Sequence, residues 1–213
     1  MAICHVESHY RFGTPNVIVS SAYMQKQLLA AGFMPQHIHQ LHHMLTTSQK
    51  PPYREVKFKN PPTLGVIARL EANKGVDIFL KALALLKQRK VPFQAKIAGD
   101  GSQKKYLLEL QEQYALTQDV EFLDWVEDTA HFYQSIDIFC LPSRQEVFGL
   151  VILEAMQYSL PMALADLPGP REVIGDSECA YWVEPNHPLA LANAIHYLIE
   201  HPQFTQTLAN RAY

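Results

Sequence analysis

The sequence predicts an α/β fold built on a doubly wound parallel sheet, which occupies residues 63–213. Short apolar runs, rich in β-branched and aromatic residues, alternate there with amphipathic segments of roughly ten residues or more. Polar and glycine-rich stretches follow several of these runs, at the points where strands would pass into helices. Because strands that alternate with helices are joined by right-handed crossovers, this order favours one parallel sheet with helices on both faces.

The expected elements of this domain follow from the pattern in chain order. Strands are expected at 64–68, 93–98, 120–123, 136–141, 161–165 and 180–183. Helices are expected at 76–89, 104–114, 129–134, 148–158 and 189–200. Pro142 closes the fourth strand, and Leu160-Pro161 ends the helix before the fifth, since proline supplies no amide hydrogen.

A shorter unit precedes this domain. Residues 16–20 and 38–45 are predicted as strands on either side of a helix at 22–31, which Gly32 ends. One βαβ unit cannot bury a core alone, so residues 1–45 are expected to be a partial remnant of an amino-terminal domain. Residues 46–62 are expected to be a linker, because pairs of prolines bracket a charged stretch there.

Composition and charge exclude several classes of protein. The net charge is −3 and no basic stripe is present, so nucleic acid is not an expected partner. Cys4, Cys140 and Cys179 lie far apart, which argues against a disulfide framework and fits a reducing, cytoplasmic location. The apolar runs are shorter than the roughly 20 residues of a membrane helix. The histidines at 37–43 lack metal-ligand spacing, so a small-molecule ligand without a metal is expected.

The most informative stretch runs from Glu146 to Glu154, two carboxylates separated by seven mostly apolar residues. Glu146 is expected on a strand-to-helix loop and Glu154 about two turns inside the helix. Open parallel sheets bind ligands at the carboxyl ends of their strands, where this loop lies. The amides of Phe148 and Gly149 could bind an anion, and Glu154 could accept hydrogen bonds from a ribose diol. Alternatively, Glu146 only caps the helix and Glu154 is a solvated helix residue.

Two cations follow the first strand of the domain. Arg69 and Lys74 are placed where they could bind a diphosphate from two sides, arginine with a planar fork and lysine with a point charge. The alternative is that both are ordinary surface cations.

The loops after the other strands carry weaker signals. Gly99 and Gly101 permit a tight turn into the following helix. Trp125 and Val126 could flank a nucleobase, although an aromatic side chain beside a strand is usually part of the core. Residues 169–172 are predicted as a turn, with Glu172 opening a short helix.

Taken together, these positions resemble the carboxyl-terminal, donor-binding domain of a retaining glycosyltransferase of the GT-B fold, in glycosyltransferase family four (glycosyl transferases group one). The resemblance covers residues 63–200, and its most specific part is Glu146-Val147-Phe148-Gly149-Leu150 with Glu154. This stretch is similar to the family's motif of two glutamates separated by seven residues. Residues 65–70 with Lys74-Gly75 resemble its phosphate-binding loop, and residues 97–101 resemble its second glycine turn.

The resemblance implies a role for each of these residues. It places Glu146, Arg69 and Lys74 at the reacting centre. It places the donor against Gly99, Gly101, Trp125, Val126, Phe148, Gly149, Leu150 and Glu154. No metal or other cofactor is implied, because basic side chains and helix amino termini stabilise the leaving nucleotide diphosphate in GT-B enzymes. The implied reaction transfers a sugar, with retention, from a nucleotide-diphosphate sugar to a glycan, lipid or small-molecule acceptor.

The chain departs from the family pattern at its two ends. Only the last βαβ unit of the amino-terminal domain is recognisable, and neither His5 nor His9 matches the family's histidine beside the donor sugar. The carboxyl-terminal crossover helix is expected to be cut. The chain is therefore expected to be the donor-binding half, which transfers no sugar alone, with an unknown acceptor and any peripheral membrane association residing in the missing domain. A nucleotide-sugar epimerase and a non-catalytic nucleotide-binding module remain alternatives.

Overall fold

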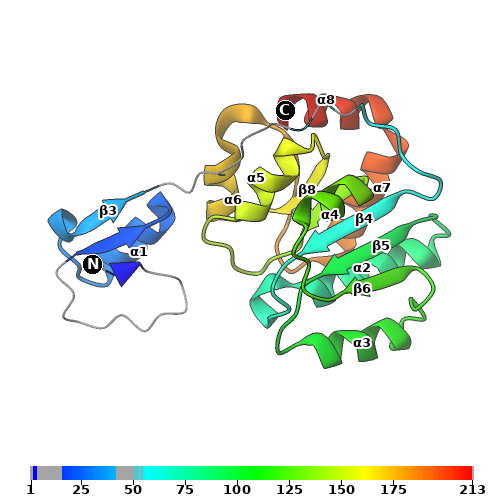
Figure 1. Ribbon diagram of the computed structural model, residues 1–213, viewed down its shortest axis with the longest axis horizontal. Helices are drawn as coiled ribbons and strands as arrows, with labels where there is room; N and C mark the ends of the chain where they lie inside the picture. The colour runs from blue at the N-terminus through cyan, green and yellow to red at the C-terminus, as the bar shows by residue number, and fades with distance from the viewer. Residues whose placement is uncertain (1, 4–15, 42–50, 52, 54, 213) are drawn as a thin grey trace.

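The computed structural model describes residues 2–3, 16–41, 51, 53 and 55–212, and every structural statement below concerns those residues. They form two parallel sheets, one of three strands and one of six, each accompanied by helices (Figure 1). The predicted α/β class with a doubly wound parallel sheet is confirmed by the larger sheet, in which every neighbouring pair of strands is parallel.

The larger sheet has the strand order β6-β5-β4-β7-β8-β9. Its strands are β4 (Thr63–Ile67), β5 (Gln94–Ala98), β6 (Val120–Leu123), β7 (Ile138–Leu141), β8 (Met162–Ala165) and β9 (Ala180–Val183). The chain enters at β4, runs outward through β5 and β6, and then returns to β7 on the other side of β4. The order therefore reverses between β4 and β7, which is the position where doubly wound sheets bind ligands.

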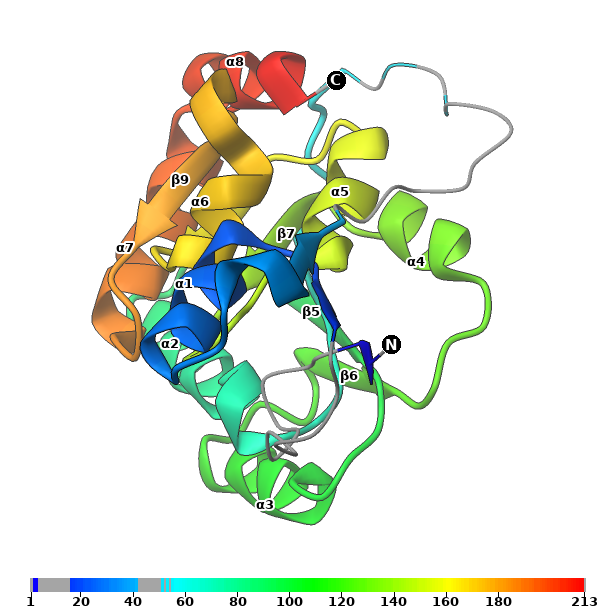
Figure 2. The ribbon, with the colours of Figure 1, turned by 90° about the vertical axis from the view of Figure 1, so that its left-hand side faces the viewer.

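Helices cover both faces of this sheet (Figures 1 and 2). One face packs against α2 (Val76–Gln88), α3 (Lys104–Gln113) and α7 (Pro188–Glu200). The other face packs against α4 (Thr129–Ser135), α5 (Leu150–Gln157) and α6 (Pro168–Ile174). The alternation of side chains along a strand produces the two cores. In β7, Ile138 and Cys140 enter the first core, whereas Phe139 and Leu141 enter the second.

The smaller unit contains the βαβ arrangement expected from the sequence. Its elements are β1 (Ala2–Ile3), β2 (Val17–Val19), α1 (Ala22–Ala30), the 3-10 turn η1 (Pro35–His37) and β3 (Ile38–Gln40), and the strand order is β1-β2-β3. The predicted continuation of the last strand at 42–45 lies outside the described residues. A small apolar core joins β2, α1 and β3, and Val147 from the loop after β7 packs against it.

Two predicted boundaries near the expected site are wrong. Helix α5 begins at Leu150 instead of 148, because Gly149 adopts a left-handed conformation with a φ of 95° and serves as the N-cap. Glu154 therefore lies about one turn inside α5, not two. The stretch predicted as a turn at 169–172 belongs to α6, which starts at Pro168, since proline is favoured in the first turn of a helix. Glu172 consequently lies within that helix and does not open it.

A helix that the sequence did not predict, α8 (Pro202–Ala212), packs against the larger unit, which consists of the six-stranded sheet and its helices. Its Leu208 joins the first core, and the side chain of Gln206 accepts a hydrogen bond of 2.8 Å from the amide of Val56. Residues 55–62, which belong to the predicted linker, have no helix or strand and lie partly along this helix. None of the described helices has both the length and the apolar character needed to cross a bilayer.

Candidate active site

A cavity of about 640 Å³ lies where the strand order reverses. Its walls come from the loops that follow β4 and β7, from the first turn of α5, and from Ser20 and Met24 of the smaller unit. Six of the residues singled out in the sequence meet in this lining: Arg69, Lys74, Glu146, Phe148, Gly149 and Leu150. The structure thus assembles most of the expected site at the carboxyl ends of two adjacent strands.

Lys74 and Glu146 form an ion pair inside this cavity. Lys74 Nζ lies 2.8 Å from Glu146 Oε2, and the two side chains are only 17% and 11% exposed. The hydroxyl of Ser143 donates a weaker hydrogen bond to the same oxygen, at 3.5 Å. Charges removed from much of the surrounding water interact more strongly than surface charges do. The sequence placed both residues at the crevice without predicting that they contact each other.

The two loops that carry this pair are joined through their backbones. The carbonyl of Asn73 accepts hydrogen bonds from the amides of Arg144 and Gln145, at 2.8 and 3.2 Å. Gly75 adopts a left-handed conformation with a φ of 65°, and a Cβ atom there would overlap the carbonyl oxygen of Pro142. Because glycine alone allows this approach, the loop after β4 and the loop after β7 pack as one piece.

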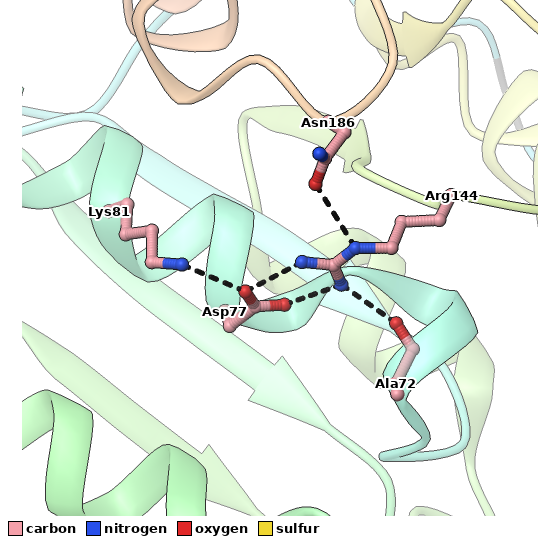
Figure 3. A network of polar contacts seen from close by, with 5 residues as sticks. All are labelled: Ala72, Asp77, Lys81, Arg144 and Asn186. Carbon is pink, nitrogen blue, oxygen red and sulfur yellow. Dashed lines mark hydrogen bonds and ion pairs between the residues drawn. The ribbon is translucent and has the colours of Figure 1, made fainter.

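The side chain of Arg144 strengthens the same junction (Figure 3). Its guanidinium donates two hydrogen bonds to the carboxylate of Asp77 in the first turn of α2, at 2.7 and 2.8 Å. It also donates to the carbonyl of Ala72 at 2.7 Å and to Oδ1 of Asn186 at 3.1 Å. Lys81, one turn along α2, donates to Asp77 at 3.1 Å. Arg144 therefore ties the loop of Glu146 to two other loops and a helix.

Asp77 is charged at neutral pH despite its burial. The side chain is buried, which would raise the pKa of its carboxyl, but hydrogen bonds from Arg144 and Lys81 more than offset this and the pKa lies below its usual value. The hydrogen bond to Asp77 is the main cause that raises the pKa of Arg144. A planar, two-pronged pair of this kind fixes orientation as well as distance.

Glu154 lies one turn beyond the cavity lining, on α5. It is four residues after Leu150 and so shares a face of the helix with that lining residue. The buried hydroxyl of Tyr133 donates a 2.7 Å hydrogen bond to Glu154 Oε2, and the ring of Tyr158 stacks on that of Tyr133. Burial, together with the charge of Glu154, raises the pKa of Tyr133, so its hydroxyl remains a donor. Tyr133 thus orients the carboxylate.

Some predicted residues lie apart from this cavity. Within the part of the chain that the structure describes, the lining does not include Gly99, Gly101, Trp125, Val126 or Glu154. The two glycines bring the loop after β5 against the carbonyls of Ala68 and Leu70. The tryptophan is 73% exposed and so is not part of a core, whereas the valine packs against the second core.

Sequence reasoning missed the residues whose contribution depends on tertiary contacts. In the lining these are Ser20, Met24, Leu141, Gln145 and Val151, and behind it they are Asp77, Tyr133 and Arg144. Asp77 carried a local signal, since an acidic residue favours the first turn of a helix, but its partner Arg144 carried none. No described cluster of three or more His, Cys, Asp or Glu side chains is arranged to hold a metal ion.

Comparison with known proteins identifies the family. The model of the family "Glycosyl transferases group 1" matches residues 49–213. This chain belongs to the glycosyl transferases group 1 family. An uncharacterized glycosyltransferase of Haemophilus influenzae is 27% identical over 163 residues, which are 76% of this chain and 46% of that protein. An alpha-D-kanosaminyltransferase of Streptomyces kanamyceticus is 30% identical over 155 residues, which are 71% of this chain and 40% of that protein. The chain thus spans less than half the length of either relative.

Solved structures share the fold. A crystal structure of Anabaena HepE in complex with UDP-glucose superposes with a TM-score of 0.79 at 25% identity, and covers 93% of this chain and 57% of that one. The carboxyl-terminal domain of a glycosyl transferase group 1 family protein, LpcC of Francisella tularensis, gives a TM-score of 0.63 at 26% identity. The match covers 72% of this chain and 85% of that one. The expected GT-B architecture is therefore confirmed, and the first likeness extends over nearly the whole chain.

Replacing Arg144 with methionine should lower the free energy of unfolding by about 1–2 kcal/mol at pH 7, since the charge on Asp77 loses its two-pronged partner while partial exposure limits the cost. Because the pKa of Asp77 is lowered in the folded state, the pair stabilises the fold above about pH 4. Its contribution is lost as the pH falls through the folded-state pKa.

Urea titrations of parent and variant from pH 7 to pH 3 would measure this effect. Arg89→Met is the matched control, because the guanidinium of Arg89 donates to the neutral amide oxygen of Asn193 and not to a carboxylate. A stability difference between parent and Arg144→Met that stays constant down to pH 3 would contradict the assignment of the effect to Asp77.

Proposed function

We propose that this chain is the donor-binding part of a retaining glycosyltransferase of family four, which uses a nucleotide-diphosphate sugar. The observation that carries the proposal is the partly buried pair of Lys74 and Glu146, which lines one cavity with Arg69 at the carboxyl ends of β4 and β7. Family membership supports it, as does the similar structure of Anabaena HepE, which contains UDP-glucose. Uridine diphosphate is therefore the first nucleotide to test.

Positive charge and backbone amides would hold the diphosphate. Arg69 and Lys74 bring two cations to the cavity, and α5 points its amino terminus at the same space through the lining residues Leu150 and Val151. Gly149, the N-cap of α5, makes no side-chain cap, so an anionic ligand can approach the start of the helix closely. In the proposal these groups stabilise the charge that develops on the leaving nucleotide diphosphate, in the role that a divalent cation has in other transferases.

Glu146 would lie beside the donor sugar, with Lys74 between the sugar and the phosphates. The ammonium of Lys74 already lies within hydrogen-bond distance of Glu146, so it can bridge that carboxylate and a phosphate oxygen. In the proposed reaction the acceptor hydroxyl attacks the anomeric carbon on the face from which the diphosphate leaves. The bond from that carbon to the phosphate oxygen breaks, and the acceptor proton passes to the departing phosphate. The configuration of the sugar is thereby retained.

Glu154 would bind the ribose of the donor. The hydroxyl of Tyr133 donates to Glu154 Oε2, and Oε1 would accept hydrogen bonds from the ribose diol. The loop with Gly99 and Gly101 would support the nucleotide from the neighbouring strand, and Trp125 with Val126 would flank the base. Trp125 has the exposed indole that such a contact needs.

Arg69→Ala and Lys74→Ala should each weaken the binding of UDP by about 2–5 kcal/mol if the site is partly desolvated, with Arg69 at the lower end because its side chain is exposed. Lys74→Ala should also lower the melting temperature, since Glu146 then keeps a partly buried charge without its cation. Calorimetric titration gives the affinities. Lys87→Ala, which removes a surface cation from α2, is the control. Binding of UDP by both site variants with the parent's affinity would refute the phosphate assignment.

Glu154→Gln should weaken UDP binding while leaving the melting temperature nearly unchanged. Glutamine keeps the volume and can still accept from Tyr133, but it is a poorer acceptor for a ribose hydroxyl. Titrating the parent and the variant with UDP and with 2'-deoxy-UDP separates the ribose contact from the rest, and Glu112→Gln on the exposed face of α3 is the control. Equal affinity of the parent for the two nucleotides would argue against this role.

Residues 1–213 are expected to bind a nucleotide diphosphate but to transfer no sugar by themselves. In the GT-B fold the acceptor is bound by the other domain, and the relatives of this chain are more than twice as long as their matched parts. The check is the release of UDP from UDP-glucose in the presence of candidate acceptors. Acceptor-dependent release by this chain would overturn the division of labour, and an altered sugar still attached to UDP would favour an epimerase.

A further inference from the structure

One carboxylate of the larger unit caps a helix of the smaller unit. Glu172, in α6, accepts hydrogen bonds from the backbone amide of Ala22, which lies 2.8 and 2.9 Å from its two oxygens, and from the amide of Tyr23 at 3.4 Å. Both amides belong to the first turn of α1. The side chain of Gln40, at the end of β3, donates to the same carboxylate at 3.1 Å. Figure 2 shows α1 in front of α6.

These contacts supply what α1 lacks. The first amides of a helix have no partner within the helix, and the helix dipole favours a negative charge at that end. Ser21, the N-cap of α1, accepts from the amide of Met24 at 3.2 Å. The amides of Ala22 and Tyr23 are thus bound from the other unit, by a charged acceptor that makes stronger hydrogen bonds than a neutral one.

The same helix also contacts the loop of Glu146. Gly169, in the first turn of α6, packs so closely on that loop that a Cβ atom would overlap the carbonyls of Glu146 and Val147. Val147 in turn packs against the apolar core of the smaller unit, to which Met24 belongs. Helix α6 therefore touches the Glu146 loop with one turn and holds α1 with the next.

We propose that Glu172 is a positioning residue for the cavity: by capping α1 it sets the distance between that helix and the Glu146 loop. Ser20 and Met24, on either side of the capped turn, then form the wall that faces Lys74 and Glu146. The ligand side of this inference rests on the proposed function. A nucleotide sugar, whose sugar lies by Glu146, reaches the α1 wall, whereas a bare nucleotide diphosphate is held by the larger unit. Loss of the Glu172 carboxylate should thus weaken the binding of UDP-glucose more than the binding of UDP.

Amide hydrogen exchange tests the cap directly. In Glu172→Ala the amide hydrogens of Ala22 and Tyr23 should exchange roughly tenfold faster or more, while that of Met24 keeps its rate because Ser21 still caps it. Glu172→Gln, which keeps one acceptor oxygen, should show a smaller increase and serves as the test if the alanine variant does not fold. Glu178→Ala, which removes an exposed partner of Arg211, is the matched control. Unchanged exchange at Ala22 and Tyr23 in both Glu172 variants overturns the proposal.

Binding tests the positioning role. The ratio of the affinities for UDP-glucose and UDP should fall several-fold in Glu172→Ala and stay at the parent's value in Glu178→Ala. Faster exchange with an unchanged ratio would make Glu172 a purely structural cap and overturn its role in positioning. If the parent chain binds neither UDP-glucose nor UDP, the proposed function fails instead. The exchange rates at Ala22 and Tyr23 then decide alone whether Glu172 holds α1.

Discussion

The pairing of β4 with β7 is the constraint on which the rest of the structure depends. These strands are far apart in the sequence, yet Leu64 lies opposite Ile138 and the loops that follow them become neighbours. Asp137 fixes this pairing at the start of both strands, because its amide donates to the carbonyl of Thr63 at 2.7 Å and its buried carboxylate accepts from the amide of Thr63 at 2.8 Å. This register places three features at one edge of the sheet: the cavity, the ion pair within it and the hydrogen bonds from Arg144 to Asp77.

The polar residues of the site are organised in two layers. Lys74 and Glu146 face the cavity, whereas the pairs of Asp77 with Arg144 and of Glu154 with Tyr133 lie behind or beside them. The second layer fixes backbone and side-chain positions before any ligand arrives, which lowers the entropy lost on binding. A buried charge is costly to leave unsatisfied, so each of these carboxylates is matched by a donor from a different element. This arrangement makes the cavity rigid on the side of the larger unit.

The sequence predicted the class of the fold and the region of the site because both follow from local patterns. Apolar runs and helical spacing located the strands and helices, and the rule that ligands bind at strand ends selected Arg69, Lys74 and Glu146. The start of helix α6 was placed too late because its Pro-Gly-Pro sequence is typical of a turn, and α8 was missed because few of its residues are apolar. The contact between Lys74 and Glu146, and the cap that Glu172 provides, depend on strand order and on packing, which no local pattern encodes.

The packing of Val147 against the core of the smaller unit has a consequence for recombination between relatives. A chimaera that joins this larger unit to the smaller unit of a relative needs an apolar surface against which Val147 can pack. That surface must lie opposite the loop that carries Glu146. An apolar surface that leaves too little room for Val147 would push the loop towards Gly169, where the approach is already too close for a Cβ atom. Crossover points chosen only by sequence similarity in the linker would therefore yield folded hybrids with misplaced active-site loops, and shape matching at this one valine is the better guide.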